Sequence, residues 1–220
     1  MKKTLNTITQ AAYGLLLSYY SKNDDVVFGA IVSGRPAQVP DIQKMVGLLF
    51  NTIPLRVKFH DKGRLSELLG DIQKYFIESQ DYHYLNVADF NKMGLSVRNP
   101  IRTLLTFENY PSELSNDDYY DISEDDKFIF EQTNYDLSTI IIPGDALQFI
   151  IKYNPLKYNK SQIDEIQSMW ELILEFIVRD EDALIQDFKA KMISLIVEKE
   201  KSEIVRQKNM NLSKLKKFKK

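Results

Sequence analysis

"VVFGAIVSGRP", Val26 to Pro36, is a run of strand-forming apolar residues that ends abruptly in a Ser-Gly-Arg-Pro turn. Valine, isoleucine and phenylalanine favour strands because their side chains pack well on a pleated, half-buried surface. Glycine and proline then interrupt the regular backbone and are typical of a turn. The stretch therefore predicts a buried strand whose end exposes an arginine.

The segments around this strand predict alternating helices and strands. A helix before it is indicated by apolar residues at helical spacing, namely Leu5, Ile8, Ala12, Leu15, Leu16 and Tyr19. A short helix is expected over 41–46. The next strand is indicated by alternating apolar residues at Ile53, Leu55, Val57 and Phe59. This strand, helix, strand order predicts a crossover unit that joins two parallel strands.

The remainder of the chain extends the same pattern. An apolar stripe from Leu65 to Phe76 predicts a helix, and Asn159 with Gln162 forms a capping-box signature ahead of another. A last helix is expected to start near Leu184. Further strands are expected in "IRTLLTFEN" (101–109), "KFIFEQTNY" (127–135), "STIII" (138–142) and "ALQFIIKY" (146–153). The acidic segment 111–126 is expected to be a solvated loop. We predict an α/β fold, with a mixed sheet packed against helices.

Composition and charge exclude several classes of protein. The 220 residues are 44% hydrophobic, which suffices for a core, and the net charge of −2 gives no case for a nucleic-acid partner. Positive charge concentrates in 199–220, where nine Lys or Arg face two Glu. We interpret this as a linker rather than a membrane-binding or nucleic-acid-binding segment. The absence of cysteine excludes disulfides and thiolate sites and fits a cytoplasmic location.

Common catalytic signatures are missing from the sequence. It has no Gly-rich phosphate loop and no Gly-x-Ser-x-Gly elbow, and its two histidines, His60 and His83, lack metal-ligand spacing. We expect His60 to lie in a turn and His83 to pack within an aromatic loop rather than act as a general base. No catalytic residue and no metal site is predicted.

Polar side chains occur where the first two predicted strands end or begin. Ser33 and Arg35 end the first strand, and Asn51 and Thr52 open the next. Ligands often bind α/β sheets at strand ends and in the adjoining loops, which makes these residues candidate binding groups. In a structural interpretation, Arg35 pairs with an acidic loop and Asn51 satisfies backbone groups. The residues alone favour the structural interpretation.

A family resemblance runs along the chain in order. "DDVVFGAIVSGRP" resembles a strand and Ser-Gly-Arg turn, and "VGLLFNTIPLR" (46–56) resembles the motif (I/V)GxFVNTxxxR. "SQDY" (79–82) is similar to the start of (H/N)QDYPFE, and "RNPI" (98–101) to the end of RDxSRNPL. Together these segments resemble the C-terminal half of the condensation domain of nonribosomal peptide synthetases, in the chloramphenicol acetyltransferase-like superfamily. The resemblance covers about Leu5 to Asp187.

The resemblance implies roles for individual residues. Ser33, Arg35 and Asn51 would line a substrate tunnel between two lobes. The positions implied to support the motifs structurally are Gly34, Gly47, Thr52, Arg56, Gln80, Asp81, Tyr82, Arg98 and Asn99. Some motif positions differ: Ser79 stands for His or Asn, and residues 83–85 are His-Tyr-Leu where the motif has Pro-Phe-Glu.

The family's catalytic motif HHxxxDG belongs to its N-terminal half, and this sequence has no adjacent histidines. The resemblance therefore implies one lobe of an amide-forming enzyme, inactive alone. It also implies that sequence upstream has been removed and that an apolar face is left uncovered. Expected partners are the N-terminal lobe, peptidyl carrier proteins and an adjoining adenylation or other domain. No cofactor is expected to bind directly; the carriers' phosphopantetheine arm would present the substrates.

Two other functions stay open. The chain could be a non-enzymatic scaffold or carrier-docking module, or a relative of acyltransferases that use free coenzyme A. In each case we divide the chain into a lobe over 1–187 and a helical, basic linker over 188–220.

Overall fold

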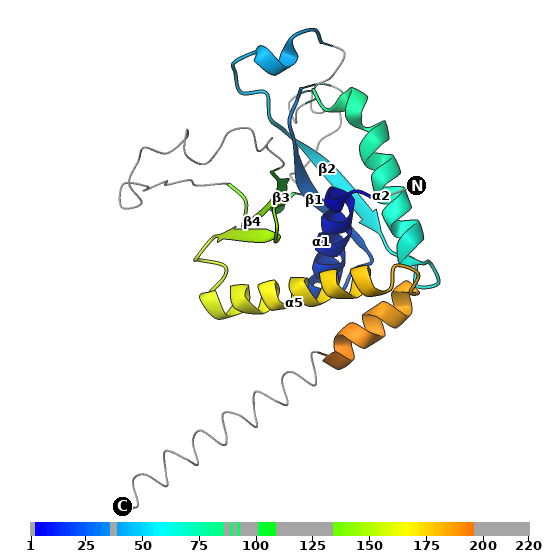
Figure 1. Cartoon of the computed structure of the whole chain (residues 1–220). Coiled ribbons are helices and arrows are strands. Elements are labelled where there is room, and N and C mark those ends of the chain that lie inside the picture. Colours follow the sequence, from blue (N-terminus) through cyan, green and yellow to red (C-terminus); the bar gives the residue numbers. More distant parts are fainter. Residues whose placement is uncertain are drawn as a thin grey trace, which may run out of the picture.

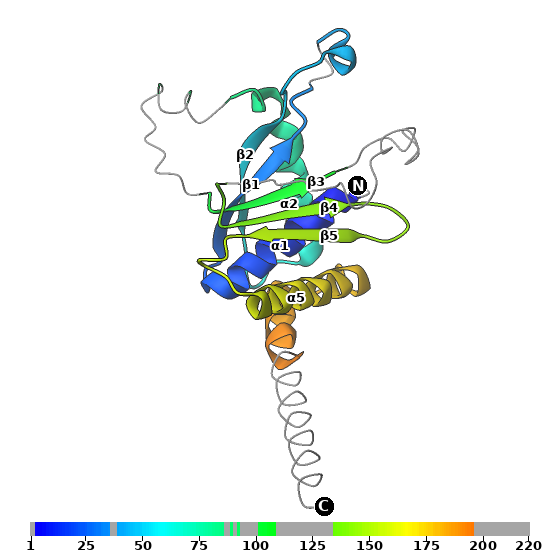
Figure 2. The ribbon, with the colours of Figure 1, turned by 90° about the vertical axis from the view of Figure 1, so that its left-hand side faces the viewer.

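The sheet is built around β1 (Asp25–Val32), which the apolar run of Val26–Val32 forms. The computed structural model describes residues 3–35, 39–85, 89, 92, 101–108 and 134–195. Figure 1 shows the sheet with its helices, and Figure 2 shows the strands of this one mixed sheet in the order β2-β1-β3-β4-β5. The bounds of the other strands are β2 Asn51–Lys58, β3 Thr103–Phe107, β4 Leu137–Ile142 and β5 Gln148–Tyr153.

The predicted crossover between the first two strands is wrong. β1 and β2 are antiparallel neighbours, with Asp25 opposite Lys58 and Val32 opposite Asn51. A parallel return usually needs a helix that packs on the sheet, whereas the described residues of this connection contain only the short 3-10 helix η1 (Ile42–Lys44). The chain therefore turns back directly. The parallel pairs are β1 with β3 and β3 with β4.

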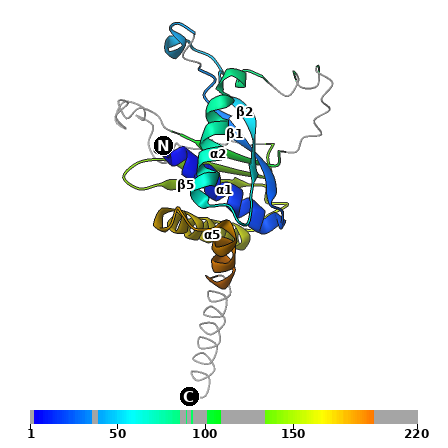
Figure 3. The same cartoon turned by 90° about the vertical axis from the view of Figure 1, so that its right-hand side faces the viewer.

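Helices cover one face of the sheet. In Figure 3, α1 (Leu5–Ser21) crosses behind α2 (Leu65–Glu78), and α5 (Lys160–Arg179) lies below α1. The chain then continues into a helix at 185–195. These helices confirm the predicted ones, and the Asn159–Gln162 capping box is present. The predicted strand at 127–135 lies almost wholly, and the loop at 111–126 wholly, outside the described residues.

The core forms where α1 meets the sheet and α5. The Tyr13 ring lies 5.0 Å from Phe28 of β1 and 5.0 Å from Trp170 of α5, measured between ring centroids, and all three side chains are fully buried. Phe188 and Met192 of the last helix are buried in the same core. Burial of these side chains holds α1 between the sheet and α5. The division of the chain at residue 187 stays a prediction.

A hairpin arm projects beyond the end of β1 and β2 (Figure 1). We define it as residues 33–35 and 39–50. At its base the two sides touch, because an ideal Cβ on Gly34 would lie 1.7 Å from the Leu49 carbonyl oxygen. Gly34 also has φ of +61°, a conformation that favours glycine. The Ser-Gly-Arg turn thus requires glycine for two independent reasons.

Gly34→Ala is expected to destabilise the chain. The left-handed backbone alone costs roughly 1–3 kcal/mol for a residue with a side chain, and the collision with Leu49 adds to that. Gly144→Ala is the matched control, since its ideal Cβ meets nothing nearer than 3.6 Å. Urea unfolding followed by circular dichroism should separate the two variants. Equal unfolding midpoints would contradict the close approach at the base of the arm.

Candidate functional site

Two of the predicted site residues are neighbours at the base of the hairpin arm. Asn51 pairs with Val32 across the antiparallel ladder, and Ser33 follows Val32 directly. The Ser33 side chain is exposed, and its hydroxyl oxygen accepts a long hydrogen bond, 3.4 Å, from the Arg35 backbone N–H. Among the described residues, the Ser33 O–H group has no acceptor and can serve as a donor. The hairpin register brings Ser33 and Asn51 together from opposite ends of an 18-residue connection.

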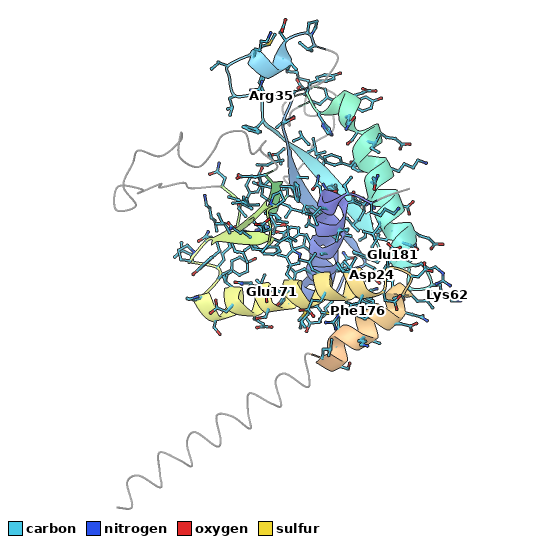
Figure 4. The ribbon with its side chains drawn as sticks, viewed as in Figure 1. Asp24, Arg35, Lys62, Glu171, Phe176 and Glu181 are labelled. Carbon is cyan, nitrogen blue, oxygen red and sulfur yellow. The ribbon has the colours of Figure 1, made fainter. Side chains whose placement is uncertain are left out.

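The Arg35 guanidinium is bound to the arm itself. It donates hydrogen bonds to the backbone carbonyl of Ile42 and, at 3.1 Å from each of two nitrogens, to that of Met45. Figure 4 shows Arg35 beside η1, at the end of the sheet away from Asp24. These acceptors are backbone groups and not the acidic loop of the structural interpretation. Arg35 holds η1 folded against the base of the arm.

The Asn51 side chain joins the start of β2 to the loop that follows α2. Its amide nitrogen donates to the carbonyl oxygens of His83 and Leu85, at 2.7 Å in each case. Its amide oxygen accepts from the Thr52 backbone N–H at 2.9 Å. Both amide hydrogens are therefore committed within the protein. This geometry makes Asn51 a positioning residue for the loop.

The loop itself contains the 3-10 helix η2 (Gln80–Tyr82), whose three side chains include none that is buried. The half-buried His83 imidazole packs edge-on against Phe76, with centroids 5.6 Å apart, and its Nε2 lies 3.0 Å from the Ser79 hydroxyl. This packing agrees with the structural role predicted for His83. The contact with Ser79 was not foreseen, although the spacing of four residues is one at which helical side chains meet.

The other predicted support residues are spread more widely. The Thr52 side chain packs against Gly29, because a Cβ added to Gly29 would lie 2.9 Å from the Thr52 methyl carbon. A Cβ added to Gly47 would meet no atom within 4 Å. The Arg56 guanidinium donates two hydrogen bonds, at 2.7 and 2.5 Å, to the Asp25 carboxylate at the start of β1. Arg98 and Asn99 lie outside the described residues.

Exposed apolar side chains gather beyond this end of the sheet. On the arm, Val46 and Leu48 are 103% and 90% exposed, and Phe50 is also exposed. The neighbouring loop exposes Tyr82 and Tyr84. Both segments project past the strand ends in Figures 1 and 2. Apolar surface of this kind marks a site of interaction with another protein surface or a ligand.

Among the residues that the structure describes, no three His, Asp or Glu side chains are placed to hold a metal ion. No helix in this part of the chain is long and apolar enough to cross a membrane. A cavity of about 240 Å³ lies between Leu15, Ile173 and Met192, with Asp24 in its lining. It is at the opposite end of β1 from Ser33.

The pH dependence of stability tests the packing of His83. Partial burial lowers the pKa of the imidazole below its ordinary value of about 6.5. The unfolded chain therefore binds a proton at higher pH than the folded chain, so the free energy of unfolding decreases as pH falls through about 6.5. His83→Gln should reduce the change in urea midpoint between about pH 7.5 and 5.5, while His60→Gln, at an exposed turn, serves as control. An unchanged slope in His83→Gln would contradict burial of the ring.

Comparison with curated proteins finds several long peptide synthetases. The chain is 32% identical over 210 residues to tyrocidine synthase 3 of Brevibacillus parabrevis, covering 92% of this chain and 3% of that protein. It is 32% identical over 201 residues to surfactin synthase subunit 2 of Bacillus subtilis (strain 168), covering 89% of this chain and 6% of the relative. The chain thus spans a small part of the relatives it matches.

Solved structures share the fold at low identity. The starter condensation domain of rhizomide synthetase matches with a TM-score of 0.62 and 16% identity, over 83% of this chain and 43% of that one. A four-domain nonribosomal peptide synthetase bound to AMP and glycine matches with a TM-score of 0.68 and 15% identity, over 84% and 15%. These likenesses confirm the predicted α/β lobe.

A family model completes the comparison. The model described as "Condensation domain" matches residues 1–205 of the 220. The relatives named above are long peptide synthetases, and one of the solved structures is a condensation domain, so the three comparisons agree. The chain therefore belongs to the condensation domain family of nonribosomal peptide synthetases.

Proposed function

We propose that this chain is the C-terminal lobe of a condensation domain and forms one wall of the tunnel in which an amide bond is made. The observation that supports this most is the combination of a family match over residues 1–205 with coverage of only 43% of a solved condensation domain. The remainder of such a domain then has to come from another segment, the N-terminal lobe.

The chemistry of amide formation requires that second lobe. An amine attacks the thioester carbonyl of a carrier-bound acyl group, the C–N bond forms and the C–S bond breaks, and the proton lost by the amine passes to the departing thiolate of the donor carrier. The described chain offers His83 with its ring packed on Phe76 and Ser79, and His60 in a turn, so neither is placed as the base. The paired histidines of HHxxxDG in the N-terminal lobe would handle the proton.

Within this proposal, Ser33, Arg35 and Asn51 at the base of the arm have different roles, because their polar groups have different partners in the protein. Ser33 is exposed and its hydroxyl can donate to the substrate amine, carbonyl or phosphopantetheine arm. Arg35 and Asn51 direct their donors to backbone carbonyls. They act by positioning, because Arg35 holds η1 against the base of the arm and Asn51 holds the 79–85 loop to the start of β2.

The exposed apolar groups favour a partner that covers this end of the lobe. Val46, Leu48 and Phe50 of the arm and Tyr84 of the loop would lose contact with water when the N-terminal lobe docks. Peptidyl carrier proteins would then deliver their thioesters to the tunnel between the lobes, and an adjoining synthetase domain would follow.

Amide formation in the presence and absence of the second lobe tests this proposal. We expect no product from the 220-residue chain alone when it is mixed with one carrier loaded with an acyl donor and another loaded with an aminoacyl acceptor. The same chain joined to its N-terminal half should form the carrier-bound amide, detected by mass spectrometry of the intact carrier. Carrier binding without amide formation by the two-lobe protein would favour a scaffold. Turnover of free acyl-coenzyme A by the chain alone would favour an acyltransferase.

Ser33→Leu in the two-lobe protein should slow amide formation by at least about tenfold, because a small displacement of reacting groups is costly in rate. Its unfolding midpoint should stay unchanged, since the side chain is exposed. Ser161→Leu, at another exposed serine on α5, is the matched control and should retain the full rate. Equal rates in the two variants would remove Ser33 from the tunnel.

A further inference from the structure

Two of the positions at which this chain departs from the family motif touch each other. Ser79 stands where (H/N)QDYPFE has His or Asn, and His83 stands where it has Pro. In the folded chain the Ser79 hydroxyl oxygen and His83 Nε2 lie 3.0 Å apart. The hydrogen bond requires the replacement at 83, because proline has no side-chain donor or acceptor.

The position of the proton in this contact follows from the neighbouring bond. The Ser79 hydroxyl donates its single hydrogen to the Phe76 carbonyl oxygen at 3.0 Å. Its oxygen must therefore accept from His83, so the imidazole carries hydrogen on Nε2. Ser79 thus connects the last turn of α2 to the imidazole through two bonds in series.

His83 makes its other contacts in different directions. The ring packs edge-on against Phe76 of α2, while the His83 backbone carbonyl accepts from the Asn51 amide at 2.7 Å. The side chain therefore holds the loop to α2, and the main chain holds it to the start of β2. Tyr82 and Tyr84, on either side of His83, remain exposed.

We infer that Ser79 and His83 form one coupled unit that replaces the motif residues and fastens the 79–85 loop between α2 and Asn51. Both members are positioning residues, since neither donates a free group to the surface that carries Ser33. The consequence for amide formation rests on the proposed function, whereas the coupling is a property of the folded chain itself.

Amide hydrogen exchange on the 220-residue chain tests the coupling directly. The reporters are the Tyr82 and Leu85 backbone N–H groups, which donate within the loop at 2.9 and 3.0 Å. Ser79→Ala and His83→Ala should each speed exchange at these amides roughly fivefold, the factor expected for one lost hydrogen bond. Because the two side chains share one hydrogen bond, the double variant should exchange clearly more slowly than the product of the two single effects. Multiplied effects in the double variant would overturn the coupling.

Two controls separate this coupling from a general loosening. Ser66→Ala changes a hydroxyl at the other end of α2, bonded to Asp182, and should leave the loop amides unchanged. Exchange of the Phe28 amide in β1 reports whether each variant remains folded. Faster exchange at the loop in Ser66→Ala would show that α2 as a whole, rather than the pair, sets the protection.

A conservative variant provides the rescue. Ser79→Thr keeps the hydroxyl that bonds the Phe76 carbonyl and the His83 imidazole, so Leu85 exchange should stay within about twofold of the starting rate. Exchange as fast in Ser79→Thr as in Ser79→Ala, with β1 still protected, would contradict the inference. The same variants in the two-lobe protein address the proposed function separately. If the exchange effects are coupled but the rate of amide formation is unaltered, the Ser79–His83 pair is established. The loop then has no role in the reaction.

Discussion

The end of the lobe that carries Ser33 depends on one side chain, the amide of Asn51. Its two hydrogens bind carbonyl oxygens at residues 83 and 85, more than thirty positions along the chain. An amide at the first position of a strand thereby fixes a loop that has little apolar burial of its own. Gly34 supplies the complementary constraint, because its lack of a Cβ lets the arm close against Leu49. Together these contacts set where the arm and the loop stand relative to the sheet.

The sequence predicted best those features that arise from local patterns. Alternating apolar residues at Ile53, Leu55 and Val57 predicted β2, because a strand buries one of its two faces. The capping residue Asn159 predicted the start of α5, because the first N–H groups of a helix need an acceptor outside it. The direction of β2 was predicted wrongly. Strand direction depends on how the connecting segment packs, and three helical residues were not enough to place a helix on the sheet.

In the candidate site, too, the residues were predicted from the sequence, whereas their particular hydrogen-bond partners were not. Ser33, Arg35 and Asn51 were identified by type and position, yet the acceptors of Arg35 and Asn51 are backbone carbonyls. Every residue carries a carbonyl, so no sequence pattern marks which one will be used. The result changes the chemistry expected of these residues. The resemblance implied that the Arg35 and Asn51 donors face a substrate, whereas the contacts agree with the structural interpretation of Asn51. In the proposed function, the exposed hydroxyl of Ser33 is the group left to face the substrate.

In the proposed function, this lobe makes half of a site and leaves its apolar end for another surface to cover. The most direct test uses the natural absence of cysteine in this chain. Ser33→Cys and the control Ser161→Cys would be placed in the two-lobe protein, and the rate of thiol labelling measured with and without a carrier bearing a non-hydrolysable acyl chain. A tunnel wall predicts that the loaded carrier slows labelling at position 33 and leaves position 161 unaffected. Equal labelling rates at position 33 with and without the loaded carrier would contradict the account.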